Sequence, residues 1–303
     1  MIDLRIVVDW MADQPEAVLT GVRELSLEEE FRNRIVLVGP KRLSSLIGTA
    51  LLQPTEEWVG MEEEIEAVRK KASASINLAC QMVKNGSASA LVSAGNSKAT
   101  VFAAFQQLGM LSGISRPAIG VLFPSARGHT LVLDCGATVD AKPVFLLQWA
   151  MLGKIFMETV LEKEDVSVGI LNNGTESTKG NKLTKEARFL FEQYLWKEFV
   201  GYQEYIFSGG ADILVCDGFV GNLILKNLED GLSFFHHDSI SYARYGGALL
   251  FGINYPVIIC HGKSNAEAVK NGIRLAKRVV DQQVILKIKD RINKERFIFC
   301  AEV

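Results

Sequence analysis

The sequence predicts an α/β fold with a mainly parallel, doubly wound sheet. Short apolar runs such as 35–38 and 166–171 alternate with longer segments such as 145–160, in which apolar residues recur at helical spacing. Strands buried on both faces have this composition, and their alternation with helices favours a parallel sheet covered by helices on both faces. The sequence therefore predicts a ligand site at the carboxyl ends of the strands, where such sheets bind ligands.

The elements follow one another along the whole chain. A paired hairpin is expected around Arg127-Gly128, and an amphipathic helix is expected last. The expected strands cover 6–9, 35–38, 90–92, 119–123, 130–133, 166–171, 212–215 and 257–260, and the expected helices cover 16–25, 72–83, 99–108, 145–160, 183–195, 223–235 and 266–280. The acidic run 62–64 is expected to be a solvated face. We expect one α/β catalytic domain over residues 1–303, or two lobes whose boundary the sequence does not mark.

Composition narrows the class of protein. The chain has 303 residues, of which 48% are hydrophobic and 22% charged, with a formal net charge of −2. This balance gives no reason to expect a nucleic-acid partner. The five cysteines stand singly without a CxxC pair, which argues against a zinc site and favours reduced thiols in a cytoplasmic protein. The N-terminal apolar run is too short for a signal peptide, and no apolar run reaches transmembrane length.

Four of the expected strand ends carry glycine beside Asn, Ser or Asp. These turns lie at 93–97, 134–137, 172–174 and 216–222. Glycine lets backbone N–H groups approach an anion closely, and a following helix N-terminus adds positive potential. The four turns together predict one crevice that binds a phosphate-like group, with Asp217, Gly218 and Gly221 contributing from the last turn.

The loop 171–181 is the first candidate for chemistry. Lys179 can place a compact positive charge on phosphate or on a developing oxyanion, Gly180 lets the chain turn into a helix, and Asn181 stands where that helix starts. A surface loop with helix-capping residues explains the same pattern equally well.

The segment 134–143 is the second candidate. Asp140 is placed to cap a helix that starts at Pro143, and Lys142 can reach a ligand. A capped helix start with a solvated lysine is the simpler interpretation of these residues, and on chemistry alone it is preferred.

Single polar residues near other helix starts have two interpretations. Asn222 and Asn96 can donate an amide N–H to a carbonyl oxygen, or they can be plain N-caps. His261 can bind an anion or a thioester, whereas Ser264 is a good N-cap for the last helix. Neither a GxSxG elbow nor a P-loop occurs in the sequence. The residues alone thus predict an α/β enzyme that binds a phosphate-containing ligand.

Six collinear motifs resemble one protein family, the phosphate acyltransferases of bacterial phospholipid synthesis (the PlsX family). The resemblance covers most of the chain from about residue 86 onward. The motifs are VSAGNS (92–97), DCGATVDAKP (134–143), GILNNGTESTKGNKLTKEA (169–187), ADILVCDGFVGNLILK (211–226), YGGALLFGIN (245–254) and HGKSNAEAVKNGI (261–273).

The resemblance implies a reaction in which acyl-acyl carrier protein and inorganic phosphate give acyl phosphate and free carrier protein. It also implies a fold like that of the isocitrate and isopropylmalate dehydrogenases and of phosphotransacetylase, a homodimer, and peripheral membrane contact. No cofactor or metal is required. Lys179 and Asn222 are then the expected catalytic residues, which orient phosphate and polarise the thioester carbonyl. The remaining expected binding residues are Asn96, Lys142, Asn181, Asp217, Gly218, Gly221, His261 and Ser264.

Two departures from the family pattern keep alternatives open. The family's Met-Gly-Gly-Asp turn is replaced by the run 9–15, which lacks both glycines, and only 233–244 stands where the family has a longer apolar and basic hairpin. The short hairpin weakens the expectation of membrane contact. The alternatives are a transferase that makes short-chain acyl phosphates such as acetyl phosphate, and a catalytically weak relative that binds carrier protein or acyl groups. A nicotinamide-dependent dehydrogenase is disfavoured, because no GxGxxG follows the first strand.

Overall fold

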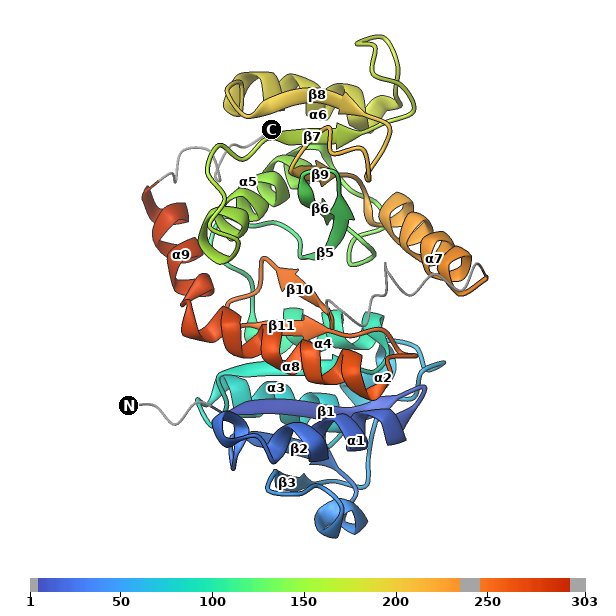
Figure 1. Cartoon of the computed structure of the whole chain (residues 1–303), viewed down its shortest axis with the longest axis vertical. Coiled ribbons are helices and arrows are strands. Elements are labelled where there is room, and N and C mark those ends of the chain that lie inside the picture. The colour runs from blue at the N-terminus through green and yellow to red at the C-terminus, as the bar shows by residue number, and fades with distance from the viewer. Residues whose placement is uncertain (1–4, 235–245, 295–303) are drawn as a thin grey trace. The chain divides into compact units, whose positions relative to one another are not determined.

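The computed structural model describes residues 5–234 and 246–294, and the chain divides into two compact units (Figure 1). Residues 5–109 and 246–281 belong to unit 1, and residues 110–234 and 282–294 to unit 2. Each unit has its own sheet of mainly parallel strands with helices packed on it. The predicted α/β class is therefore confirmed. Tyr245 and most of the short segment 233–244 lie outside the described residues.

The sheet of unit 1 is parallel except for its last strand, β10, which runs antiparallel to β11. Most of its strands are buried and largely apolar, as a sheet covered on both faces requires. The strands, in sheet order, are β3 (Leu51–Pro54), β2 (Ile35–Gly39), β1 (Ile6–Ala12), β4 (Ala90–Ala94), β11 (Val257–Ile259) and β10 (Ala248–Phe251).

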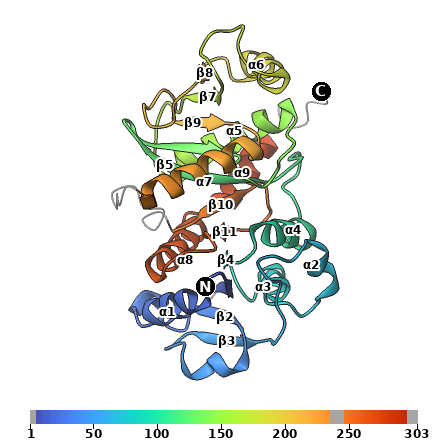
Figure 2. The same cartoon turned by 90° about the vertical axis from the view of Figure 1, so that its right-hand side faces the viewer.

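Two pairs of helices pack on this sheet. Helices α1 and α8 pack against each other and against β1, and α3 and α4 form the other pair; Figure 2 shows the two pairs on opposite sides of the strands. Gly21 permits the close approach of α1 and α8, because an ideal Cβ there would lie 2.8 Å from the carbonyl oxygen of Ala266. The helices are α1 (Pro15–Ser26), α2 (Glu66–Lys70), α3 (Ser75–Lys84), α4 (Ser97–Leu108) and α8 (Ala266–Asp281).

The sheet of unit 2 contains four parallel strands and the expected hairpin, in which β5 runs antiparallel to β6. The strands, in sheet order, are β5 (Ala118–Ser125), β6 (Gly128–Leu133), β9 (Ile213–Val215), β7 (Val168–Leu171) and β8 (Phe199–Gln203). The long apolar α5 (Pro143–Val160) packs on β6 and β9 and contacts both α6 (Lys182–Tyr194) and α9 (Val284–Lys294), while α7 (Gly218–Phe234) follows β9.

Several elements were not expected from the sequence. Helices α2 and α9 and strands β3, β8 and β10 have no counterpart among the predicted elements, and α9 follows the helix that was expected to be the last. In the part of the chain that is described, no helix combines the length and apolar character that a membrane span requires.

Candidate active site

Three of the four glycine turns meet at one edge of unit 2. Strands β6, β9 and β7 are parallel neighbours, so their carboxyl ends lie at the same edge of the sheet. The turns that follow them begin at Asp134, Cys216 and Asn172. The fourth turn, 93–97, belongs to unit 1. The sequence-predicted residues are thus gathered as two sets, one in each unit.

The buried carboxylate of Asp134 organises the turn after β6. It accepts backbone N–H groups from Gly136, Ala137 and Thr138 at 2.6–3.1 Å, and from Ile119 of the neighbouring strand at 2.7 Å. Burial raises the pKa of Asp134 to about 6, although these four hydrogen bonds act in the opposite direction. The turn is therefore fixed by a polar hub that sequence reasoning did not single out.

Two glycines let the start of α7 pack directly on this turn. An ideal Cβ on Gly221 would lie 1.9 Å from the carbonyl oxygen of Asp134, and one on Gly218 would lie 2.6 Å from the Asp134 carboxylate. The N–H of Gly218 donates to the carbonyl of Thr138 at 2.9 Å. Both glycines are thus required by close packing between two backbone segments, and the Gly218 N–H is already used within the protein.

Asp217 and Asn222 have different surroundings at the start of α7. Asp217 caps the helix, because its Oδ1 accepts the N–H of Val220 at 2.8 Å. Asn222 lies five residues further on, half-buried, with its Cγ 3.4 Å from the position an ideal Cβ would take on Gly136. Its amide has no hydrogen bond to any described residue. The interpretation of Asn222 as an N-cap is therefore wrong, and its amide is available to a ligand.

The loop between β7 and α6 presents Lys179 at its end. Gly180 adopts a φ of +95°, which favours glycine, and its N–H donates to Asn173 Oδ1 at 3.0 Å. Asn181 caps α6 by accepting the N–H of Thr184 at 2.9 Å, which leaves the Asn181 Nδ2 group without a partner among the described residues. The predicted turn at Gly180 is confirmed. Asn181 uses its Oδ1 as the helix cap and keeps its Nδ2 group as a free donor.

The side chain of Lys179 is exposed and its stem packs over Gly174. An ideal Cβ on Gly174 would lie 2.8 Å from Lys179 Cγ and 2.8 Å from Glu176 Oε2, so a larger residue would displace the lysine stem. The Lys179 ammonium forms no ion pair or hydrogen bond with any described residue. Its positive charge is therefore free to meet an anion from solution.

A cavity of about 560 Å³ lies within unit 2, next to this loop. It collects residues from the turns after β7 and β9 and from the starts of α6 and α7, and so from two of the four glycine turns. Asn181 and Asp217 line it, and so does Gly180, directly after Lys179. Its other polar lining residues are Asn172, Asn173, Thr184 and Glu204.

Lys142 lies at the N-cap position of α5 and is exposed. It stands four residues before Leu146, which lines the cavity. The expected cap by Asp140 is wrong: the helix begins at Pro143 without a side-chain cap, and Asp140 is exposed two residues before Lys142.

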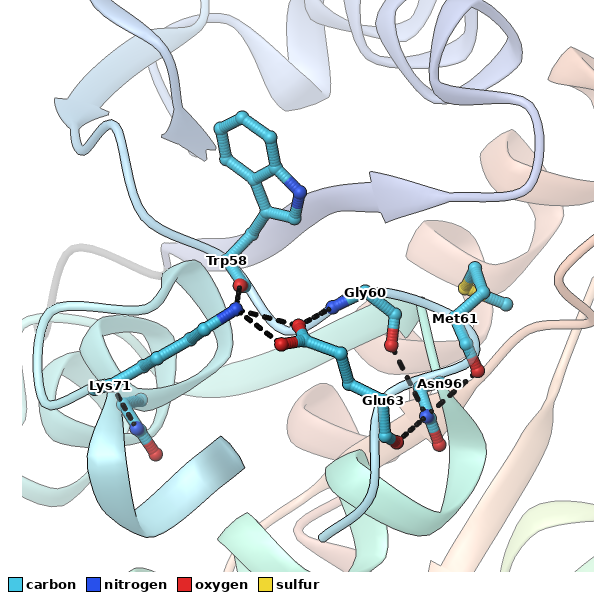
Figure 3. A network of polar contacts seen from close by, with 7 residues as sticks. Trp58, Gly60, Met61, Glu63, Lys71 and Asn96 are labelled. Carbon is cyan, nitrogen blue, oxygen red and sulfur yellow. Dashed lines mark hydrogen bonds and ion pairs between the residues drawn. The ribbon is translucent and has the colours of Figure 1, made fainter. Parts of the chain in front are cut away.

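Asn96 belongs to unit 1, where its amide holds a neighbouring loop. Its Oδ1 accepts the N–H of Ala99 at 3.1 Å and caps α4. Its Nδ2 points to the carbonyl oxygens of Gly60, Met61 and Glu63 at 2.9–3.3 Å (Figure 3). Both ends of the amide are therefore engaged within the protein, as a structural cap and anchor.

The acidic run 62–64 is not simply a solvated face. The Glu63 carboxylate accepts the Gly60 N–H at 2.5 Å and pairs with the Lys71 ammonium at 2.6 Å, and Lys71 also donates to the carbonyl of Trp58 at 2.9 Å (Figure 3). The Lys71 and Gly60 hydrogen bonds lower the pKa of Glu63 below its usual value. The loop that Asn96 anchors is thus also closed by an ion pair.

His261 and Ser264 follow β11, the strand beside β4, so they share the carboxyl edge of unit 1 with Asn96. His261 Nδ1 accepts the N–H of Lys263 at 3.2 Å. Ser264 is buried, and its hydroxyl has no partner among the described residues. The expectation that Ser264 caps the last long helix is wrong, because Asn265 accepts the N–H of Ala268 at 2.9 Å and caps α8 instead.

Asp9 is a second buried carboxylate that sequence reasoning passed over. It lies within β1 and accepts hydrogen bonds from the Ser93 hydroxyl at 3.1 Å and from the Met11 N–H at 3.3 Å. Burial raises its pKa to about 6. A carboxylate inside an otherwise apolar strand was the signal that could have identified it.

Comparison with known proteins agrees with the motifs. A family model described as "Fatty acid synthesis protein" matches residues 4–237 and 233–287. Phosphate acyltransferases from Desulforamulus reducens and Geotalea daltonii are 37% and 41% identical to this chain. The first alignment covers 97% of this chain and 98% of the relative. The second covers 95% of this chain and 95% of the relative. The chain belongs to the phosphate acyltransferase family. It is accordingly an enzyme of the transferase class.

Solved structures show which fold this family member shares. A branched-chain phosphotransacylase from Enterococcus faecalis V583 has a TM-score of 0.65 at 15% identity, covering 91% of this chain and 99% of that one. A phosphotransacetylase from Streptococcus pyogenes has a TM-score of 0.61 at 18% identity, covering 93% and 94%. A 4-hydroxythreonine-4-phosphate dehydrogenase from Klebsiella pneumoniae has a TM-score of 0.59 at 11% identity, covering 91% and 99%. The predicted similarity to the folds of phosphotransacetylase and of a dehydrogenase is confirmed.

Proposed function

We propose that this phosphate acyltransferase converts acyl-acyl carrier protein and inorganic phosphate into acyl phosphate and free carrier protein, for phospholipid synthesis. A phosphate oxygen attacks the thioester carbonyl carbon, the carbon–sulfur bond breaks, and the departing thiolate takes up a proton. Thiolate is a good leaving group, so the reaction needs no covalent enzyme intermediate and no cofactor. The protein has to hold a dianion close to the carbonyl and stabilise the oxyanion that develops.

The observation that carries the proposal is the free Lys179 ammonium, on the residue directly before Gly180, which lines the unit 2 cavity. Gly180 and the Asn173 hydrogen bond fix the end of its loop, and no described residue neutralises its charge. Asn181 Nδ2 adds an unused donor on the next helix start. In this proposal Lys179 and Asn181 receive phosphate, and Lys142 supplies a second cation from the start of α5.

Asn222 is the proposed donor to the thioester carbonyl. Its amide is unpaired among the described residues, and the turn it rests on is held by the Asp134 hub, so the amide needs little reorganisation as charge develops. Gly218 and Gly221 act by allowing this packing. Asp217 acts by capping α7, because a carboxylate would repel a phosphate dianion.

Residues of unit 1 have supporting roles in the proposal. Asn96 fixes the loop 60–63, and His261 and Ser264, at the carboxyl edge of unit 1, stay proposed binding residues. Both units then act as parts of one catalytic protein, with acyl carrier protein as partner and a homodimer as the assembly. The mass of the protein in solution, alone and with carrier protein, tests both expectations.

The decisive assay is phosphate-dependent release of the carrier thiol from long-chain acyl-acyl carrier protein. Lys179→Ala should lower the rate about 100-fold or more, as loss of an oxyanion or phosphate donor does. Lys182→Ala is the matched control, because that side chain is 87% exposed and forms only a loose ion pair with Glu186 at 3.8 Å. A folded Lys179→Ala protein with near-normal turnover would contradict the proposal. Carrier binding without phosphate-dependent release would favour the catalytically weak relative.

A short-chain acyl phosphate-forming transferase is the alternative, and the phosphotransacylase fold shared with the solved structures is compatible with it. Rates with acetyl and long-chain thioesters separate the two functions, because a short-chain enzyme should prefer the acetyl donor.

A further inference from the structure

One wall of the unit 2 cavity is apolar. The side chains that form it come from α5, from the ends of β7 and β9, and from the first turns of α6 and α7. They are Leu146, Leu171, Leu183, Cys216, Val220 and Ile224. A volume of about 560 Å³ is in the range of small-molecule binding sites. These side chains therefore offer a ligand apolar surface in the cavity next to the loop that carries Lys179.

Three of the polar side chains that line the cavity already have hydrogen-bond partners within unit 2. Asn172 Nδ2 donates to the Gly174 carbonyl at 3.0 Å, and Asn172 Oδ1 accepts the Thr184 hydroxyl at 3.2 Å. Asp217 Oδ1 accepts the Val220 N–H. Since these groups already have partners, an apolar occupant would leave few of them without a hydrogen bond.

The charge of the lining disfavours an anion inside the cavity. Glu204 and Asp217 contribute carboxylates, and none of the described residues that line it is basic. The Lys179 ammonium is unpaired among the described residues, and Lys179 directly precedes the lining residue Gly180. An occupant with a neutral apolar part and one reactive polar end matches this distribution, with the polar end beside Lys179.

We propose that this cavity receives the acyl chain of the thioester substrate and sets the acyl-chain preference. The inference rests on the function proposed above and adds the place where the chain binds. The chain lies against Leu146 and Ile224, and the carbonyl stays at the rim with phosphate. Because a buried methylene contributes about 0.8 kcal/mol, each methylene excluded from the cavity should weaken binding about fourfold.

Ile224→Phe tests the proposal, because it narrows the cavity from α7 without touching Lys179 or Asn222. Leu223→Phe is the matched control, since Leu223 precedes it on the same helix, is 53% exposed and does not line the cavity. The two variants are compared by kcat/KM with butyryl- and palmitoyl-loaded carrier protein and by the KM for phosphate. Binding of cis-parinaric acid, a fluorescent long-chain fatty acid, is measured in parallel and needs no turnover.

Ile224→Phe should lower kcat/KM for the palmitoyl substrate at least about tenfold more than for the butyryl substrate, the effect of excluding two or more methylenes. The KM for phosphate should not change, and Leu223→Phe should keep the wild-type preference. An Ile224→Phe protein with the wild-type chain preference, or with equal losses for both substrates, would overturn the proposal.

The fatty-acid measurement separates this inference from the proposed function. If the wild-type protein releases no thiol in the presence of phosphate, the proposed function fails. Even then, binding of cis-parinaric acid that Ile224→Phe weakens and Leu223→Phe does not would support the cavity as an acyl site. Equal binding by all three proteins, or no binding to any of them, would reject it.

Discussion

Replacement of Gly221 by alanine should damage the protein more than its small size suggests. The added Cβ would lie 1.9 Å from the carbonyl oxygen of Asp134, whereas real Cβ contacts essentially never fall below 3.0 Å. Two backbone segments, the start of α7 and the turn after β6, would have to separate by about 1 Å. Overpacking of a well-packed core costs typically about 1–3 kcal/mol, and a backbone clash belongs at the upper end.

We therefore expect Gly221→Ala to lower the free energy of unfolding by about 3 kcal/mol, which corresponds to a drop in Tm of roughly 5 °C for a chain of 303 residues. The folded fraction of the variant should also turn over more slowly than the wild type, because the same displacement moves Asn222. Calorimetry and the thiol-release assay measure the two effects.

Gly231 provides the control within the same helix. An ideal Cβ on Gly231 meets nothing within 4 Å. Alanine has a better helix propensity than glycine, so Gly231→Ala should stabilise the protein by about 0.5–1 kcal/mol and keep full activity. If both alanine variants melt at the same temperature, the close-packing explanation of Gly221 is refuted.

Three further predictions concern other parts of the molecule. The pKa of Asp9 is about 6 in the folded protein and 3.8 in the unfolded chain, so its contribution to stability is complete below about pH 4 and is lost as the pH rises through 6. In urea unfolding, the free energy of unfolding should therefore fall less with rising pH for Asp9→Asn than for the wild type, by up to roughly 3 kcal/mol. Asn96→Ala should cost about 1–3 kcal/mol in thermal unfolding, and Asn96→Asp should cost at least as much, because it keeps the cap but turns a carboxylate oxygen toward three carbonyl oxygens. Burial raises the pKa of Cys80 and Cys260 to about 12, so a thiol reagent should label them only after denaturation, and rapid labelling of the native protein at these positions would count against their burial.

Strong sequence signals and observed elements agree where the pattern was long and apolar. The segment 145–160 is α5 almost to the residue, and the hairpin around Arg127-Gly128 is β5–β6. Strand β8 was missed because it is short, half-exposed and interrupted by Gly201 at a φ of +86°. Helix α9 was missed because its apolar stripe follows directly after that of α8.

The candidate site was predictable in composition and less so in role. The turns at Lys179 and Asn222 were found because glycine and amide residues follow apolar strands. The caps at Asn265 and Asp217 could not be chosen from sequence, since neighbouring Ser264 and Asn222 are equally good candidates in local terms. One of the four hydrogen bonds of the Asp134 hub comes from Ile119, in a strand fifteen residues earlier, and local patterns do not contain that contact.

The pairing of β4 with β11 has a consequence for biosynthesis. Strand β4 is made early, yet its neighbour β11 and the covering helix α8 are encoded after nearly all of unit 2. As the ribosome proceeds, the nascent chain therefore exposes β4 as an edge strand, a surface that invites wrong pairing. Unit 2 is also incomplete until α9, which packs on α5, has been synthesised. Neither unit can complete its native contacts until residues 246–294 have left the exit tunnel, so C-terminal truncation should harm both halves of the protein.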